Sequence, residues 1–317
     1  MAVKMNPSDE PVSVISTVPA AADAEPGHGS RIPRLPPARP KGRRRTGLRT
    51  KAVAYGFLAL AALFALAPFL WVGLASVKRP IDAFSLPPVW DFSATLEAYR
   101  VLWYQHDFAT FFMNTVLVAV ATVVVSLVIS LPAAYALARY TKRGALVLLV
   151  VALLFRALPR MAVVLPFYYI SRELGLYDTK FTLVAVLVAV NQPFTIWLLR
   201  NFFVSLPDAL EESAMIDGCS RFQAFRRVIL PLVRPGLAAA GVFTFLLAYQ
   251  DYLIPVILTQ SNAVTLPVFI AQFSTENIAD WPVISAASVS LALPVVALIL
   301  LAQRWLVAGL TAGSVKG

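Results

Sequence analysis

Six long apolar stretches constrain this chain more than any other feature of its sequence. They run approximately over residues 53–75, 108–138, 145–170, 181–199, 236–258 and 282–303. A helix that crosses the hydrocarbon core of a bilayer needs about 20 apolar residues at about 1.5 Å rise per residue. Hydrophobic residues make up 59% of the chain and charged residues only 14%, against about 45–50% and about 25% in soluble proteins. The sequence therefore predicts an all-α, polytopic membrane protein with six transmembrane helices, and it excludes a soluble globule.

The first 51 residues differ in composition from the rest of the chain. Residues 1–51 hold 10 of the 27 lysines and arginines, and residues 1–50 hold eight prolines with almost no apolar periodicity. Such a segment cannot offset its ordering entropy, so we expect a disordered basic tail over 1–51 and a membrane domain over 52–317. The run Arg43-Arg44-Arg45 suits nucleic acid or anionic lipid, but basic residues just before a span more often determine topology. We expect contact with membrane lipid and no nucleic-acid partner.

The distribution of basic residues predicts the orientation in the membrane. If the N-terminus is inside, the tail and the inner connections carry 20 lysines and arginines, and the outer loops carry five: Lys78, Arg79, Arg100, Arg172 and Lys180. Positive residues concentrate on the cytoplasmic side of membrane proteins. Both termini are therefore predicted to be cytoplasmic.

Polar residues inside the spans are candidates for a translocation pathway, because burying them in hydrocarbon is costly. They are Arg156, Asn191, Gln192, Gln250 and Asp251. One interpretation is a pathway that offers hydrogen bonds to a solute, and the other is bonding between helices. Arg156 and Arg160 have the spacing of one helix face, so they need partners, and Asp251 is a candidate.

No enzyme signature is present in the sequence. It has no phosphate-binding loop, no H-E-x-x-H and no G-x-S-x-G, and its two histidines and single cysteine make a metal site implausible. The densest acidic group lies in a polar loop with no nucleophile pattern nearby: Asp208, Glu211, Glu212 and Asp217. We therefore predict no catalytic residue, no cofactor and no metal.

The loop at 200–235 has the start and stop signals of two short helices. Ser205 resembles an N-cap before Pro207, and Gly218 suits the left-handed residue that ends a helix. Ser220 and Gln223 form a second capping box, before an apolar stripe that we expect Pro231 to end. A cytoplasmic helix-turn-helix is predicted, which either lies on the membrane surface or docks to another protein.

This loop resembles a known family. Glu212-Ser213-Ala214-Met215-Ile216-Asp217-Gly218, followed after nine residues by Val228-Ile229-Leu230-Pro231, is similar to the E-A-A-x-x-D-G-x9-I-x-L-P loop of binding-protein-dependent ABC importer permeases. Four further segments resemble the carbohydrate branch, specifically the second transmembrane subunit of maltose-type systems: Ala133 to Arg139, Gly175 to Thr179, Pro193 to Trp197, and the ending from Gln303 to Gly317.

The resemblance implies a function and a set of partners. The chain would be the permease subunit of an ATP-driven ABC importer for a carbohydrate or polyol, in a prokaryotic inner membrane, working by alternating access. It would assemble with a second permease subunit, two ATPase subunits that hydrolyse the ATP, and an extracytoplasmic sugar-binding protein or lipoprotein. The ATPase-coupling residues implied are Glu212, Ser213, Ala214, Asp217, Gly218, Leu230 and Pro231. The alternatives are an importer for another small solute, such as a phosphorylated polyol, and a secondary transporter.

Overall fold

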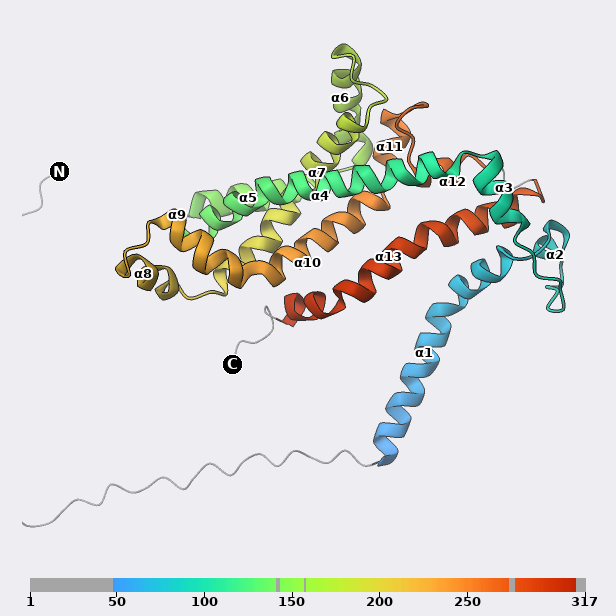
Figure 1. Cartoon of the computed structure of the whole chain (residues 1–317), viewed down its shortest axis with the longest axis horizontal. Helices are drawn as coiled ribbons and strands as arrows, with labels where there is room; N and C mark the ends of the chain where they lie inside the picture. The colour runs from blue at the N-terminus through green and yellow to red at the C-terminus, as the bar shows by residue number, and fades with distance from the viewer. Residues whose placement is uncertain (1–47, 141–142, 157, 274–276, 312–317) are drawn as a thin grey trace, which may run out of the picture. The chain divides into compact units, whose positions relative to one another are not determined.

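Helices make up the regular structure of this chain. The computed structural model describes residues 48–140, 143–156, 158–273 and 277–311. Every regular element within these ranges is helical (Figure 1): α1 Leu48–Ala75, α2 Pro80–Phe84, α3 Glu97–Gln105, α4 Phe108–Arg139, α5 Arg143–Phe155, α6 Arg160–Glu173, α7 Lys180–Val204, α8 Ala209–Ile216, α9 Arg221–Ala224, the π-helical turn η1 Phe225–Ile229, α10 Leu230–Tyr249, α11 Leu253–Leu258, α12 Leu266–Ile270 and α13 Asp280–Thr311. The all-α prediction is confirmed for this part of the chain.

The chain divides into two compact units, Met1–Phe57 and Leu58–Gly317. Residues 1–47 of the predicted tail lie outside the described ranges, and α1 begins at Leu48, inside the predicted tail of residues 1–51. The second unit contains the rest of α1 and all elements from α2 to α13.

Five helical segments among the described residues are long and apolar enough to cross a membrane: Lys51–Ala75, Phe108–Arg139, Lys180–Val204, Arg221–Tyr249 and Asp280–Gln303. The third predicted span, 145–170, is divided between α5 and α6, which have 13 and 14 residues. Pro159 precedes α6 with extended backbone (ψ 120°). A proline has no N–H to continue a helix and disfavours helical backbone at the residue before it, so the break falls here.

Helices α4 and α7 run in the same direction. Gln192 of α7 donates its amide to Ser130 Oγ of α4 at 2.8 Å, and about two helical turns further on Arg200 Nε donates to the carbonyl of Leu137 at 3.3 Å. Both partners advance together along the chain, which happens only between parallel helices. The intervening segment of α5 and α6 must therefore bring the chain back from the end of α4 to the start of α7.

Helix α10 runs antiparallel to α7 and approaches it closely. Thr195 and Thr244 share a hydrogen bond of 3.1 Å, whereas nearer the other end Gly236 of α10 faces Phe202 of α7. A Cβ at position 236 would lie 2.7 Å from Cδ2 and 2.8 Å from Cδ1 of that ring. Glycine at 236 therefore allows the two helices to pack at this distance.

Replacing Gly236 by alanine is expected to destabilise the protein by about 1–3 kcal/mol, because the Phe202 ring must move in a packed interface. Gly241 provides a matched control on the same helix, since its Cβ would meet Leu127 at an ordinary 3.5 Å. Thermal unfolding of the purified protein should show a lower midpoint for Gly236→Ala only. Equal midpoints for the two variants would contradict the close approach.

An aspartate joins two connections at one end of the bundle. Asp178, between α6 and α7, accepts hydrogen bonds from four consecutive backbone N–H groups, those of Gln260, Ser261, Asn262 and Ala263, at 2.9–3.1 Å. Burial opposes its ionisation, but these backbone donors outweigh burial and hold the pKa of the Asp178 carboxyl at about 2. The carboxylate thus holds the connection between α11 and α12 against the start of α7.

Candidate functional site

Gly218 makes the turn of the predicted helix-turn-helix. Its φ of +87° is the left-handed conformation that glycine adopts without strain. The N–H of Gly218 donates to the carbonyl of Met215 at 3.1 Å, and the N–H of Cys219 donates to that of Ala214 at 3.0 Å. This pair of bonds is a Schellman motif, which ends α8 and turns the chain into α9. The conformation predicted for Gly218 is confirmed.

The second capping box is also present. Ser220 Oγ accepts from the N–H of Gln223 at 3.3 Å, and Gln223 Oε1 accepts from the N–H of Ser220 at 2.9 Å. Each side chain satisfies a backbone donor that the first turn of α9 leaves free. The sequence pattern therefore located the start of α9 correctly.

Two details of this loop were predicted wrongly. Ser205 does not cap α8. It is the C-terminal cap of α7, with helical backbone (φ −73°, ψ −14°), and α8 begins only at Ala209. Pro231 does not end the second helix either, because α9, η1 and α10 form one continuous helix. The N–H of Leu230 bonds to the carbonyl of Phe225, five residues back. Pro231 thus follows the wide π-helical turn inside a continuous helix and does not end it.

The helix-turn-helix is joined to the membrane helices by contacts that the sequence did not predict. Arg139, near the end of α4, contacts Glu211 of α8, with Nε 3.5 Å from Oε2, and its Nη1 bonds to Asp208. Tyr135, one turn earlier, donates its hydroxyl to Glu211. The side chains of Arg139 and Glu211 are 8% and 9% exposed, so this ion pair is almost fully removed from water. We call these four residues the α4–α8 latch.

The seven predicted coupling residues fall into two groups. Glu212, Ser213, Asp217 and Gly218 are exposed, whereas Ala214 is buried, and Leu230 and Pro231 are half-buried at the start of α10. The adjacent glutamates thus differ, because Glu211 points into the α4–α8 latch and Glu212 into solvent. Two large apolar side chains flank the turn in exposed positions, Ile216 at 85% and Phe222 at 68%.

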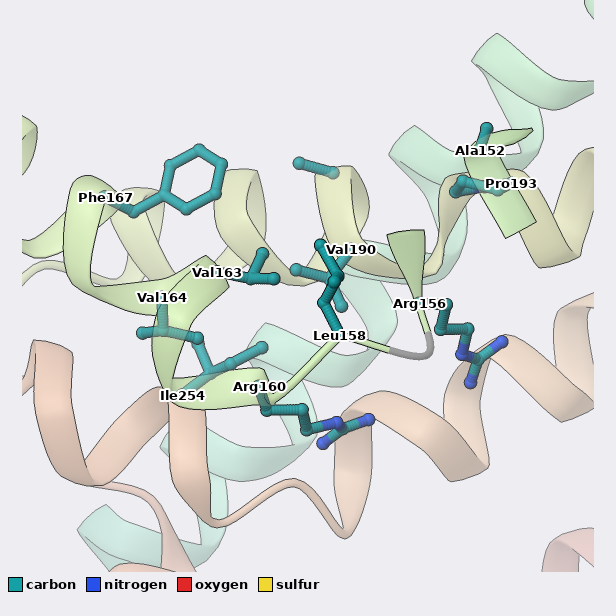
Figure 2. A pocket seen from close by; sticks show the side chains of 11 residues that line it. Ala152, Arg156, Leu158, Arg160, Val163, Val164, Phe167, Val190, Pro193 and Ile254 are labelled. Atoms are coloured by element: carbon teal, nitrogen blue, oxygen red, sulfur yellow. The ribbon is translucent and has the colours of Figure 1, made fainter. Parts of the chain in front are cut away.

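A cavity of about 140 Å³ lies beside the break between α5 and α6 (Figure 2). Arg156 and Arg160 are not on one helix face as predicted, because α5 ends at Phe155 and α6 begins at Arg160. Both nevertheless line this cavity. Arg160 Nη1 donates to Asp251 Oδ2 at 2.6 Å, so the predicted pairing of Asp251 with one of the two arginines is present.

The other predicted pathway residues are placed differently. Asn191 is fully buried and bonds to the Leu187 carbonyl of its own helix at 2.9 Å. Gln192 is half-buried and bonds to α4, whereas Gln250 is exposed at the end of α10. Gln250 is thus the most exposed of these three amides, and the pathway roles of all five predicted residues stay predictions.

The fold and these two sites define a multi-pass helical membrane protein with a helix-turn-helix between two of its long helices. Residues 126–311 match the family described as binding-protein-dependent transport system inner membrane component. This chain belongs to that family.

Relatives of known role resemble the chain over most of their length. The diacetylchitobiose uptake system permease protein DasC of Streptomyces coelicolor is 37% identical over 252 residues, covering 79% of this chain and 91% of the relative. The trehalose transport system permease protein SugB of Mycobacterium tuberculosis is 35% identical over 257 residues, covering 80% and 93%. A solved bacterial ABC transporter involved in the import of the acidic polysaccharide alginate gives a TM-score of 0.66 at 26% identity, covering 80% and 95%.

Proposed function

We propose that this chain is the membrane-spanning permease subunit of an ATP-driven importer for a carbohydrate or polyol, and that it moves its substrate by alternating access. Membership of the family and relatives named for diacetylchitobiose, trehalose and alginate transport support the solute class. The partners proposed are a second permease subunit, two ATPase subunits and an extracytoplasmic sugar-binding protein. A secondary transporter is disfavoured by the family and by the helix-turn-helix, which has no use without a docking partner.

The observation that carries the coupling role is the exposed apolar tip of the helix-turn-helix. Ile216 and Phe222 stand on either side of the Gly218 turn with most of their surface in solvent. Large exposed apolar side chains grouped around a rigid turn mark a docking site for another protein. We assign this tip to the ATPase subunit, with Glu212 as a polar contact beside it.

The coupling element also includes the contacts that attach α8 to the helix bundle. Because the α4–α8 latch joins α8 to α4, movement of the tip is transmitted to a membrane helix. ATP-driven closure of the ATPase pair would then draw two such tips together and reorient the helices around the solute.

We also propose six crossings with both termini inside. The parallel packing of α4 and α7 supports this count, since α5 and α6 must jointly return the chain to the other side. In a Cys219→Ser background, single cysteines at exposed positions Arg100 and Glu173 should react with an impermeant thiol reagent from outside intact cells, and one at Asn201 should not. Outside labelling at 201 would show that α5 and α6 do not cross.

The transport function is tested in proteoliposomes that contain the complete importer. Uptake of a radiolabelled disaccharide should require both ATP inside the vesicles and the binding protein outside them. Uptake that continues without ATP but collapses with the proton gradient would instead identify a secondary transporter.

A further inference from the structure

The cavity beside the α5–α6 break has an unusual charge. It is walled mainly by apolar side chains, and its two charged lining residues are both arginines, Arg156 and Arg160. Figure 2 shows the two side chains leaving the break between α5 and α6 and extending in the same general direction. An apolar wall keeps the local dielectric low, which strengthens any attraction between these cations and an anion in the cavity.

Only one of the two positive charges is neutralised within the described residues. Asp251, with 1% of its side chain exposed, binds Arg160 at 2.6 Å and also accepts from the N–H of Ile254 at 3.0 Å. Both of its oxygens are therefore engaged. Arg156 lies over the ring of Phe194, with its guanidinium carbon 5.0 Å from the ring centroid, and no described residue accepts a hydrogen bond from its guanidinium.

This placement prepares Arg156 for an anion that presents two oxygens. The contact with Phe194 is a cation–π contact, and the guanidinium N–H groups form a fork that can bind two oxygens at once. Arg156 is half-buried in a stretch predicted to cross the membrane, where a charge facing lipid is costly. Its open side is therefore expected to face a water-filled path.

We infer that the transported solute carries an acidic group, a carboxylate, sulfonate or phosphate, and that Arg156 binds that group in the α5–α6 cavity. This inference rests on the proposed function. Arg160 has a separate role as a positioning residue: by holding Asp251, it keeps that carboxylate from neutralising Arg156. An uncharged sugar can accept hydrogen bonds from Arg156, but only an acidic group also gains the attraction between opposite charges.

The test uses the complete importer in proteoliposomes and a mixture of matched sugars. Glucose, glucuronate, sulfoquinovose and glucose 6-phosphate differ only at one carbon, and galactobiose and digalacturonate add a matched disaccharide pair. We expect ATP-dependent import of at least one acidic member in preference to its neutral counterpart. The acidic member that is imported then identifies whether the group is a carboxylate, a sulfonate or a phosphate.

Two substitutions locate the recognition at this cavity. Leu158 lines the same cavity, so Leu158→Glu places a competing carboxylate beside Arg156, and Leu158→Gln has the same shape without the charge. Acidic import should be at least tenfold lower with Leu158→Glu than with Leu158→Gln, because the two side chains differ only in charge. Arg156→Gln should repeat the loss, whereas Arg79→Gln, which removes an exposed arginine paired with Asp82, should not.

The outcomes separate this inference from the proposed function. ATP-dependent import of neutral sugars alone overturns the acidic substrate and leaves the transport function standing, whereas no ATP-dependent import of any member removes both. Acidic import that is unchanged in an assembled Arg156→Gln complex also overturns the inference. If Arg156→Gln instead prevents assembly, and Leu158→Glu and Leu158→Gln import equally, Arg156 pairs with the partner subunit and not with the solute.

Discussion

Replacing Gly218 by valine is expected to lower ATP-driven uptake at least tenfold while the protein still inserts in the membrane. Residue 218 has a φ of +87°, which a β-branched side chain adopts only with strain, so both bonds of the Schellman motif should be lost. The tip formed by Ile216 and Phe222 would then point elsewhere and fail to engage the ATPase. Uptake and the stimulation of ATPase activity by the binding protein measure the effect.

Asparagine at position 218 is the matched control. A Cβ there would meet no heavy atom within 4 Å, so the effect of valine is conformational and not steric. Asparagine tolerates left-handed backbone and should retain most of the uptake, although its side chain is nearly as large as that of valine. Wild-type transport and wild-type ATPase stimulation in the valine variant would refute the role of this turn in coupling.

Substitutions of the neighbouring residues Glu211 and Glu212 are expected to affect different properties, stability for Glu211 and ATPase coupling for Glu212. Glu211→Ala removes one partner of an almost fully buried ion pair and should destabilise the protein by about 3 kcal/mol, seen as a lower unfolding midpoint and less assembled complex. Glu212→Ala removes an exposed side chain and should leave the midpoint unchanged while weakening ATPase stimulation.

A double-mutant cycle on Arg139 and Glu211 tests the α4–α8 latch. Arg139→Gln should reproduce the instability of Glu211→Ala, and combining the two substitutions should cost less than the sum of their separate effects, because they remove one interaction. Additive effects of Arg139→Gln and Glu211→Ala would show that these two side chains do not act together in holding α8 against α4.

The membrane helices could be predicted because apolar length is a direct consequence of bilayer thickness. The sequence also contained the cause of the break in the third stretch, because Pro159 lies between Arg156 and Arg160, but the prediction treated that stretch as one helix. Spacing placed Arg156 and Arg160 on one helix face, whereas the break separates them. A regular spacing predicts a shared face only while the helix continues.

The loop shows the same limit of local patterns. The Gly218 turn and the Ser220 box were predictable, since both depend on bonds between residues a few positions apart. The α4–α8 latch was not, because Arg139 and Glu211 meet only after three helices have folded. Ser205 had a capping sequence but remained part of α7, where its hydroxyl bonds to the Phe202 carbonyl instead.

The carboxylate that joins the two connections has a consequence for growth in acid. The pKa of Asp178, about 2, lies below the ordinary aspartate value of about 3.9. Its contribution to folding is therefore complete above the ordinary value and disappears only as the pH falls through about 2. Asp178 belongs to the side that we propose faces outward, where pH follows the surrounding medium. A medium at about pH 4–5 should therefore leave the Asp178 hydrogen bonds intact, so a loss of uptake there would not originate at this carboxylate.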